Sequence, residues 1–175
     1  NNYQDAIIQF ERYIKLINYI NKDETDMSLY TSSLCYLVDL YSNEKNYTKA
    51  YSYNEVLIPL LKVNYEENAQ RWKTEYKNKA LNQSFFANLL GKFKEGEQYS
   101  LEAIKVDSTK HIAYTNLAAA LLFQGKVIEA EKLYLEYKDE FKNTFIDDFA
   151  EFERLGVIPE ERKADVERIK AILNE

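Results

Sequence analysis

The chain has 175 residues, of which 46% are hydrophobic and 30% are charged, so it is long enough to bury one continuous core. Its net charge of −6 argues against a general nucleic-acid role, because phosphate binding needs a surplus of Lys and Arg. One cysteine excludes an internal disulfide framework, one histidine without close partner ligands argues against a metal site, and no apolar run is long enough to insert into a membrane.

The N-terminal stretch predicts a long amphipathic helix. Four glycines and two prolines are too few turn formers for many short strands, which favours an all-α fold. The first helix should run from Tyr3 to about Ile20, since Ile7, Phe10, Ile14, Ile17 and Ile20 recur every three or four residues. The chain begins at Asn1 without methionine or signal peptide, so we expect a truncated N-terminus. The compartment stays open, with the cytoplasm favoured and the periplasm as the alternative.

Three further helices are expected before residue 91. The second should run from about Asp26 to Ser42 and end in a glycine-free turn at 43–46. The third should begin at Tyr47 and reach about Val63, with a kink or an early stop at Pro59, where the helix loses a hydrogen bond. The fourth should extend without interruption from about Tyr65 to Leu90, because neither Gly nor Pro occurs between them.

The C-terminal half continues the helical pattern. Helices are expected from about Phe93 to Val106, from Ile112 to Gln124 and from Val127 to about Phe141, giving about nine in the whole chain. A turn at 156–159 precedes the last helix, with Pro159 at its start. Its apolar stripe of Val166, Ile169 and Ile172 is narrow and its other side is polar, which is typical of a capping helix.

A repeat is visible in this half. Gly91 and Gly125 are each followed by Lys and, five residues on, by a small residue with Glu on both sides, namely Gly96 and Ala130. A period near 34 with helical patterning predicts helix pairs stacked into a solenoid. Ala164 is interpreted as the next member of the Gly96 and Ala130 series.

This spacing resembles that of the tetratricopeptide repeat family. The resemblance implies a right-handed superhelical solenoid of antiparallel helix pairs, with glycine in the turns and a small residue where two helices cross closely. The run Asn2-Tyr3-Gln4-Asp5-Ala6, echoed at 46–50, resembles the start of the second helix of a repeat, so the chain should be the C-terminal part of a longer array. The expected units are 1–24 (a half repeat), 25–63, 64–108, 109–142 and 143–175 (a degenerate repeat and cap).

A half repeat lacks the helix that would cover the apolar face of its remaining helix. We expect the apolar face of residues 1–20 to be partly exposed, and the isolated chain to self-associate through it at high concentration.

The resemblance also implies a function, that of a non-catalytic protein–protein interaction module. Members of the family hold an extended peptide or a partner helix in a concave groove, and asparagine there suits a peptide backbone because it both donates and accepts hydrogen bonds. The chaperone-binding members grip a terminal carboxylate with a Lys and an Asn four residues on, a pair that no unit here has. The alternative is a regulatory or sensing segment of a larger protein whose effector domain lies outside this chain. The groove positions carried over are Cys35, Tyr36, Asp39 and Ser42, then Asn78, Asn82, Phe85 and Asn88, and finally Thr115, Asn116, Ala119 and Leu122.

Other functional interpretations are weaker. Cys35 and His111 would fall on different helices, which favours a packed thiol and a helix-start imidazole over a nucleophile and its base. The stretch 91–96 lacks the Gly-Lys-Ser/Thr order of a phosphate-binding loop, and the carboxylates are spread along solvated helix faces. We therefore expect no catalytic residue, metal or cofactor. Trp72, beside Arg71 and Lys73, lies outside the repeat positions, and its role stays open between binding or self-association and packing.

Overall fold

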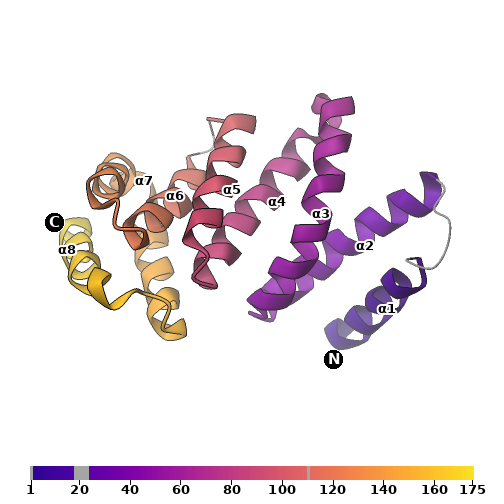
Figure 1. Ribbon diagram of the computed structural model, residues 1–175, viewed down its shortest axis with the longest axis horizontal. Coiled ribbons are helices and arrows are strands. Elements are labelled where there is room, and N and C mark those ends of the chain that lie inside the picture. The colour runs from indigo at the N-terminus through magenta and orange to yellow at the C-terminus, as the bar shows by residue number, and fades with distance from the viewer. Residues whose placement is uncertain (1, 18–23, 110) are drawn as a thin grey trace. The chain divides into compact units, whose positions relative to one another are not determined.

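The computed structural model describes residues 2–17, 24–109 and 111–175, and this part of the chain is all-helical, as expected (Figure 1). The chain divides into two compact units, Asn1–Lys79 and Ala80–Glu175. The first contains α1 (Asn2–Ile17), α2 (Glu24–Asn43), α3 (Tyr47–Glu67) and the start of α4 (Ala69–Leu89). The second contains the rest of α4, then α5 (Phe93–Val106), α6 (Ile112–Phe123), α7 (Val127–Leu155), a 3-10 turn (Glu160–Arg162) and α8 (Lys163–Asn174).

Four helices end in the same hydrogen-bonded turn. After α4, Gly91 N–H donates to the carbonyl of Asn88 and Lys92 N–H donates to that of Ala87, which is the Schellman pattern with one residue in the left-handed conformation. Positive φ at Gly91 and Gly125 confirms the expected role of these glycines. In the glycine-free turn Lys45 takes this conformation, at a cost of about 1–2 kcal/mol. Among the described residues, the left-handed positions are Lys45 (φ 55°), Gly91 (73°), Gly125 (82°) and Gly156 (65°).

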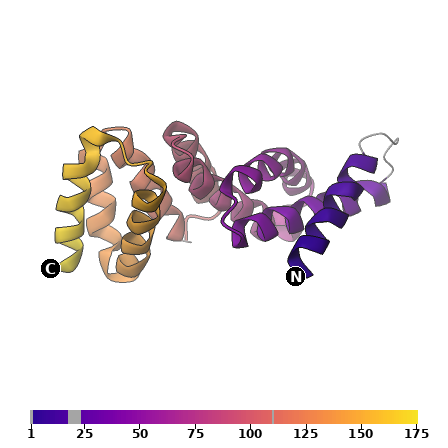
Figure 2. The same ribbon diagram turned by 90° about the horizontal axis from the view of Figure 1, so that it is seen from below.

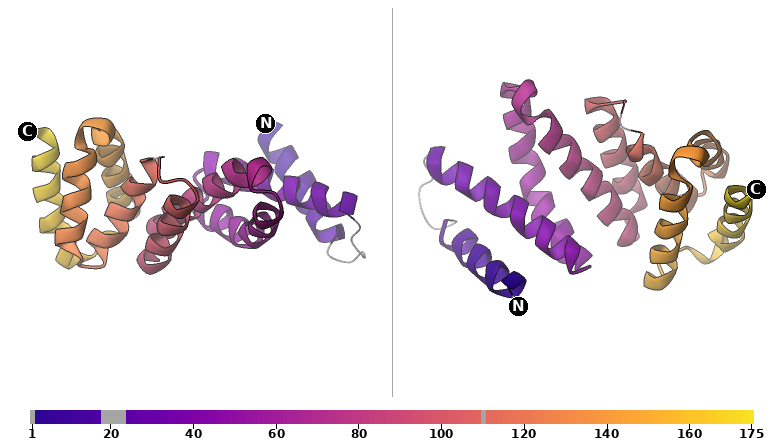
Figure 3. Two further views of the ribbon diagram at one scale, coloured as in Figure 1. Left: turned by 90° about the horizontal axis from the view of Figure 1, so that it is seen from above. Right: turned by 180° about the vertical axis from the view of Figure 1, so that it is seen from behind.

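In the first unit, α1 lies alongside α2, and α2 packs against α3 (Figures 1 and 3). This packing buries Ile7, Ile14 and Ile17, so these three residues do not share the partial exposure expected of that face. The fourth member of the face, Phe10, is half-buried, and the end of the expected helix at Ile20 lies outside the described residues. Self-association through residues 1–20 stays a prediction. The large apolar side chains that α1 does expose are Tyr3, Ile8 and Leu16.

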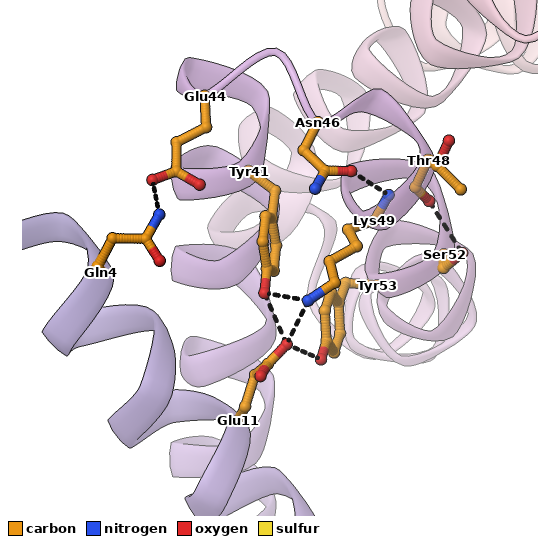
Figure 4. Close-up of polar contacts among 9 residues, drawn as sticks. All are labelled: Gln4, Glu11, Tyr41, Glu44, Asn46, Thr48, Lys49, Ser52 and Tyr53. Atoms are coloured by element: carbon orange, nitrogen blue, oxygen red, sulfur yellow. Dashed lines mark hydrogen bonds and ion pairs between the residues drawn. The ribbon is translucent and has the colours of Figure 1, made fainter.

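A polar network joins α1, α2 and α3 (Figure 4). Glu11 Oε1 accepts hydrogen bonds from Tyr41 Oη at 2.6 Å and Tyr53 Oη at 2.9 Å, and it lies 3.1 Å from Lys49 Nζ. Lys49 Nζ also donates to Tyr41 Oη at 2.7 Å, and the rings of Tyr41 and Tyr53 stack. These bonds, that of Tyr41 foremost, lower the pKa of the Glu11 carboxyl. Gln4 and Glu44 make a second polar link between α1 and α2.

The boundary between α3 and α4 differs from the expected one. The third helix runs through Pro59 to Glu67, so the early stop at Pro59 is wrong. The fourth helix begins only at Ala69, so the expected uninterrupted helix from Tyr65 to Leu90 is wrong too. Asn68 separates the two helices in an extended conformation (φ −146°, ψ 81°), and its Oδ1 accepts from Arg71 N–H at 3.1 Å. Asparagine at this position caps α4, which is why a polar stretch without Gly or Pro still contains a break.

In the second unit α6 packs between α5 and α7. A Cβ atom at Gly96 would lie 2.0 Å from Asn88 Oδ1, and Ala130 is fully buried, in agreement with the close packing expected at both positions. The backbone of α7 is non-helical at Phe141 (φ −127°, ψ 19°), near the expected end of that helix. Large buried side chains of the core from α6 to α8 are Leu117, Leu121, Leu122, Phe123, Tyr134, Phe145, Phe149, Phe152, Val166, Ile169 and Leu173.

The last helix packs against α7 (Figure 2) but does not continue the repeat. Ala164, the expected counterpart of buried Ala130, is exposed, and the buried stripe ends at Leu173 instead of Ile172. Three residues of 3-10 turn come before α8, and they rotate the chain by about 60° more than α-helix would. None of the helices in the described ranges combines the length and the apolar character needed to cross a bilayer.

Candidate binding site

An open cleft of about 500 Å³ lies in the first unit between α2 and the beginning of α4. We call it the α2–α4 cleft. The cleft brings together two features that are separate in the sequence: the first group of expected groove positions, on α2, and the segment around Trp72, on α4. The lining residues are Thr31, Ser32, Cys35, Tyr36 and Asp39 from α2, and Arg71, Trp72 and Glu75 from α4.

Contacts across the cleft join residues that are 40 apart. Cys35 Sγ lies 3.6 Å from Glu75 Oε1, and Lys79 Nζ donates to Asp39 Oδ1 at 2.6 Å. At the same offset Trp72 is level with Ser32 on α2. The repeat spacing of 46 residues holds at the turns, where Lys45 and Gly91 both have a positive φ, but Asn78 and Asn82, which it makes equivalent to Ser32 and Tyr36, do not line the cleft. Sequence reasoning missed Glu75 and Lys79, because the repeat spacing relates equivalent positions and does not say which side chains meet across a cleft.

Two carboxylates share one buried ammonium group in the cleft. The side chain of Lys79 is only 5% exposed, with Nζ 2.6 Å from Asp39 and 3.9 Å from Glu75 Oε1. The side chains of Asp39 and Glu75 are 54% and 42% exposed. A buried lysine needs such pairing, because removing its partners would leave an uncompensated charge in the core. The carboxylates stay accessible to a ligand, whereas the lysine does not.

Aromatic side chains stand beside these charges. Tyr36 is 58% exposed, and it stacks on Phe10 of α1 with ring centroids 5.3 Å apart. Trp72 is half-buried, with the Arg71 guanidinium carbon 5.1 Å from its ring. Trp and Tyr at the edge of a cleft combine a large apolar area with little conformational entropy, which makes them frequent binding hot spots.

The Cys35 thiol in the cleft is not an activated nucleophile. Burial raises the pKa of Cys35 to about 12, so the group is a neutral thiol at physiological pH. His111, in the second unit, lies 2.9 Å from a Glu140 carboxylate oxygen and packs near the Tyr137 ring. Within the described residues no group of three or more His, Cys, Asp or Glu side chains is arranged to hold a metal ion.

Half of the ten expected groove residues are buried in the second unit instead of lying on an open surface: Asn88, Thr115, Asn116, Ala119 and Leu122. Asn88 Nδ2 donates to the carbonyl of Asn116 at 2.9 Å, and Asn116 Nδ2 donates to that of Leu81 at 3.1 Å. These amides join helices instead of facing a peptide, because α6 is apolar on nearly all sides and is buried accordingly.

Of the other five expected groove residues, two line the cleft and three lie on α4 outside it. Tyr36 and Asp39 line the α2–α4 cleft. Asn78 is exposed on α4, and Asn82 is half-buried. Phe85 is also half-buried, with its ring 6.5 Å from that of Phe152. Of the two further groove positions, Cys35 lines the cleft and Ser42 is half-buried without lining it.

No protein-family model, no curated protein and no solved structure matches this chain. The resemblance to tetratricopeptide repeats therefore rests on the spacing of the chain's own residues.

Proposed function

We propose that the chain is a non-catalytic binding module of the tetratricopeptide repeat type, and that its α2–α4 cleft holds a segment of another polypeptide. The observation that carries this proposal is the pairing of exposed Tyr36 and half-buried Trp72 with two accessible carboxylates in one cleft. Aromatic groups supply the binding area, and the charged groups beside them supply orientation and specificity.

The repeat assignment is supported by three similar turns. Lys45, Gly91 and Gly125 each have a positive φ, and each is followed five residues later by a buried small residue. These small residues are Ala50, Gly96 and Ala130, at the start of α3, α5 and α7. The same helix–turn–helix geometry at the same spacing is what a right-handed solenoid of helix pairs needs in each repeat.

The dimensions of the cleft suit a short peptide. The lining residues of α2 from Thr31 to Asp39 rise by about 12 Å along the helix. An extended chain spans that length with about four residues. A contact of this size is small, so we propose transient binding in the micromolar range, at about −8 kcal/mol or weaker.

The test uses the single tryptophan of the sequence, since Trp72 lines the cleft and its emission reports on ligand binding there. Random dodecapeptides displayed on phage are selected on the full chain, and the enriched peptides are then titrated while Trp72 emission is recorded. We expect saturable changes in emission, with Kd about tenfold higher for Tyr36→Ala. Leu101→Ala removes another exposed apolar side chain, from α5, and should leave Kd unchanged. Absence of enriched peptides, or equal Kd values for the two variants, would contradict the proposal.

A further inference from the structure

We propose that the α2–α4 cleft selects a polypeptide segment carrying an arginine or lysine, and that Asp39 and Glu75 receive its cationic group. This inference rests on the binding role proposed above. It adds the chemical class of the partner, which neither the sequence pattern nor the fold supplies.

The two carboxylates of the cleft keep acceptor atoms that no described residue uses. Within the protein, Asp39 is bonded through Oδ1 to Lys79, and Glu75 contacts Cys35 and Lys79 through Oε1. Among the described residues, Asp39 Oδ2 and Glu75 Oε2 have no donor. Each ionised carboxylate can accept about four hydrogen bonds, so both keep unused capacity. The two side chains are about half-exposed, and this capacity is therefore open to a ligand.

The charges around Lys79 do not balance. Among the described residues, Lys79 is the cation that contacts both carboxylates, and its side chain is only 5% exposed. Two negative charges thus share one positive charge that no ligand can reach. A further cation at this place would gain from both carboxylates, whereas an anion would be repelled.

Tyr36 lies beside Asp39 on α2, because it precedes Asp39 by three residues. Phe10 covers one side of the ring, and the remaining surface is exposed. An arginine guanidinium or a lysine stem can lie on this aromatic surface while its charged end meets the carboxylates. The combination of an aromatic surface and two adjacent acceptors matches a basic side chain better than it matches an apolar one.

Arg71 lies four residues before Glu75 on α4, about 6 Å along the helix axis, and its guanidinium carbon is 5.1 Å from the centroid of the Trp72 ring. Its charge disfavours a cation at that end of the cleft, so the favoured place for the cationic group of the ligand is the end where Asp39 lies beside Tyr36.

The experiment changes the charge of the ligand first, because that leaves the fold of the protein untouched. A selected peptide that contains arginine is synthesised again with citrulline, which has nearly the same shape and no charge, and both are titrated against the full chain by Trp72 emission. If the chosen peptide carries lysine instead, its acetylated form serves the same purpose. We expect the neutral peptide to bind at least about tenfold more weakly, as loss of a hydrogen-bonded charge pair requires.

Variants of the protein then locate the effect. Glu75→Gln and Asp39→Asn should each reduce the preference for the charged peptide, whereas Glu55→Gln removes an exposed carboxylate of α3 and should preserve it. Melting curves show whether either cleft variant is unfolded, and the citrulline comparison stands in both cases. Enriched peptides without Arg or Lys, or equal binding of the charged and neutral forms, would overturn this inference while leaving the binding function intact. Absence of any binding peptide would overturn both.

Discussion

Position 96 has no room for a side chain. A Cβ atom there would lie 2.0 Å from Asn88 Oδ1 and 3.3 Å from the carbonyl oxygen of Ser84. Asn88 is fully buried and donates to the carbonyl of Asn116, so its amide cannot turn away without losing that bond. Glycine in the middle of a helix is unfavourable by about 1 kcal/mol relative to alanine, and here packing outweighs that preference.

Gly96→Ala should therefore destabilise the chain by about 1–3 kcal/mol, the range for overpacked sites. In an Asn88→Ala background the clash is gone, and the same substitution should be neutral or stabilising by up to about 1 kcal/mol. Urea denaturation of the two single variants and the double variant measures both effects. An equal effect of Gly96→Ala in the two backgrounds would show that Asn88 does not set the restriction.

Ala130 and Ala164 are equivalent positions by the repeat spacing, yet Ala130 is buried and Ala164 is exposed. Ala130→Leu should destabilise by about 1–3 kcal/mol, since a larger side chain at a fully buried position forces its neighbours apart. Ala164→Leu is the matched control and should change stability by less than about 0.5 kcal/mol. Similar shifts of the urea midpoint in both variants would contradict these positions.

Among the helices, α1 is held to α2 and α3 by the Glu11 network, whose stabilisation depends on pH. The pKa of Glu11 is lowered in the folded state, first by the hydrogen bond from Tyr41. A lowered folded-state pKa stabilises above the unfolded value, and this contribution is lost as pH falls through the folded value. Wild type should exceed Glu11→Gln in stability most at pH 7 and least at about pH 3. A difference in urea midpoint that is constant over this range would contradict the role given to the network.

The second part of α7 should show the opposite dependence on pH. Burial, followed by the neighbouring Asp147, raises the pKa of Asp148 to about 7. A folded-state pKa above the unfolded one means that stability falls as pH rises from about 4 to about 7. Asp148→Asn should therefore raise the melting temperature at pH 8 and have little effect near pH 4. Asp147→Asn, at an exposed neighbouring position, should have a much smaller effect at pH 8. Equal effects of the two variants would contradict the burial of Asp148.

The sequence was sufficient to predict which segments form helices, but not to predict where every helix ends. Gly91 and Gly125 gave correct turns because their left-handed conformation depends only on local chain geometry. Asn68 was missed because an asparagine in a polar stretch ends a helix only when its side chain caps the next one. The error stays local, because the spacing of 46 residues from Lys45 to Gly91 and from Ala50 to Gly96 does not depend on it.

The candidate site was predictable only in part. Tyr36 and Asp39 follow from their position on α2, and both line the cleft. Their partners on α4 depend on how the two helices pack, which the repeat spacing does not state. The buried asparagines mislead for another reason, because an amide that joins two helices and an amide that binds a peptide look alike in sequence.

For the molecule as a whole, the proposal places ligand binding in one of its two units. The α2–α4 cleft belongs wholly to Asn1–Lys79, and the expected groove residues of α6 in Ala80–Glu175 are buried. Peptide binding should therefore leave the helical core of the second unit unchanged and act on one face of the first.

Backbone amide chemical shifts of the full chain, recorded by NMR with and without a selected peptide, test this most directly. We expect the largest changes within residues 31–39 and 71–79, where the cleft-lining residues lie, and small changes along α6 and α8. Tyr36→Ala should reduce the changes at a given peptide concentration, because its lost contact area raises Kd. Changes concentrated in residues 80–175, or on the exposed side of α1 at Ile8 and Leu16, would contradict the proposal that the α2–α4 cleft is the binding site.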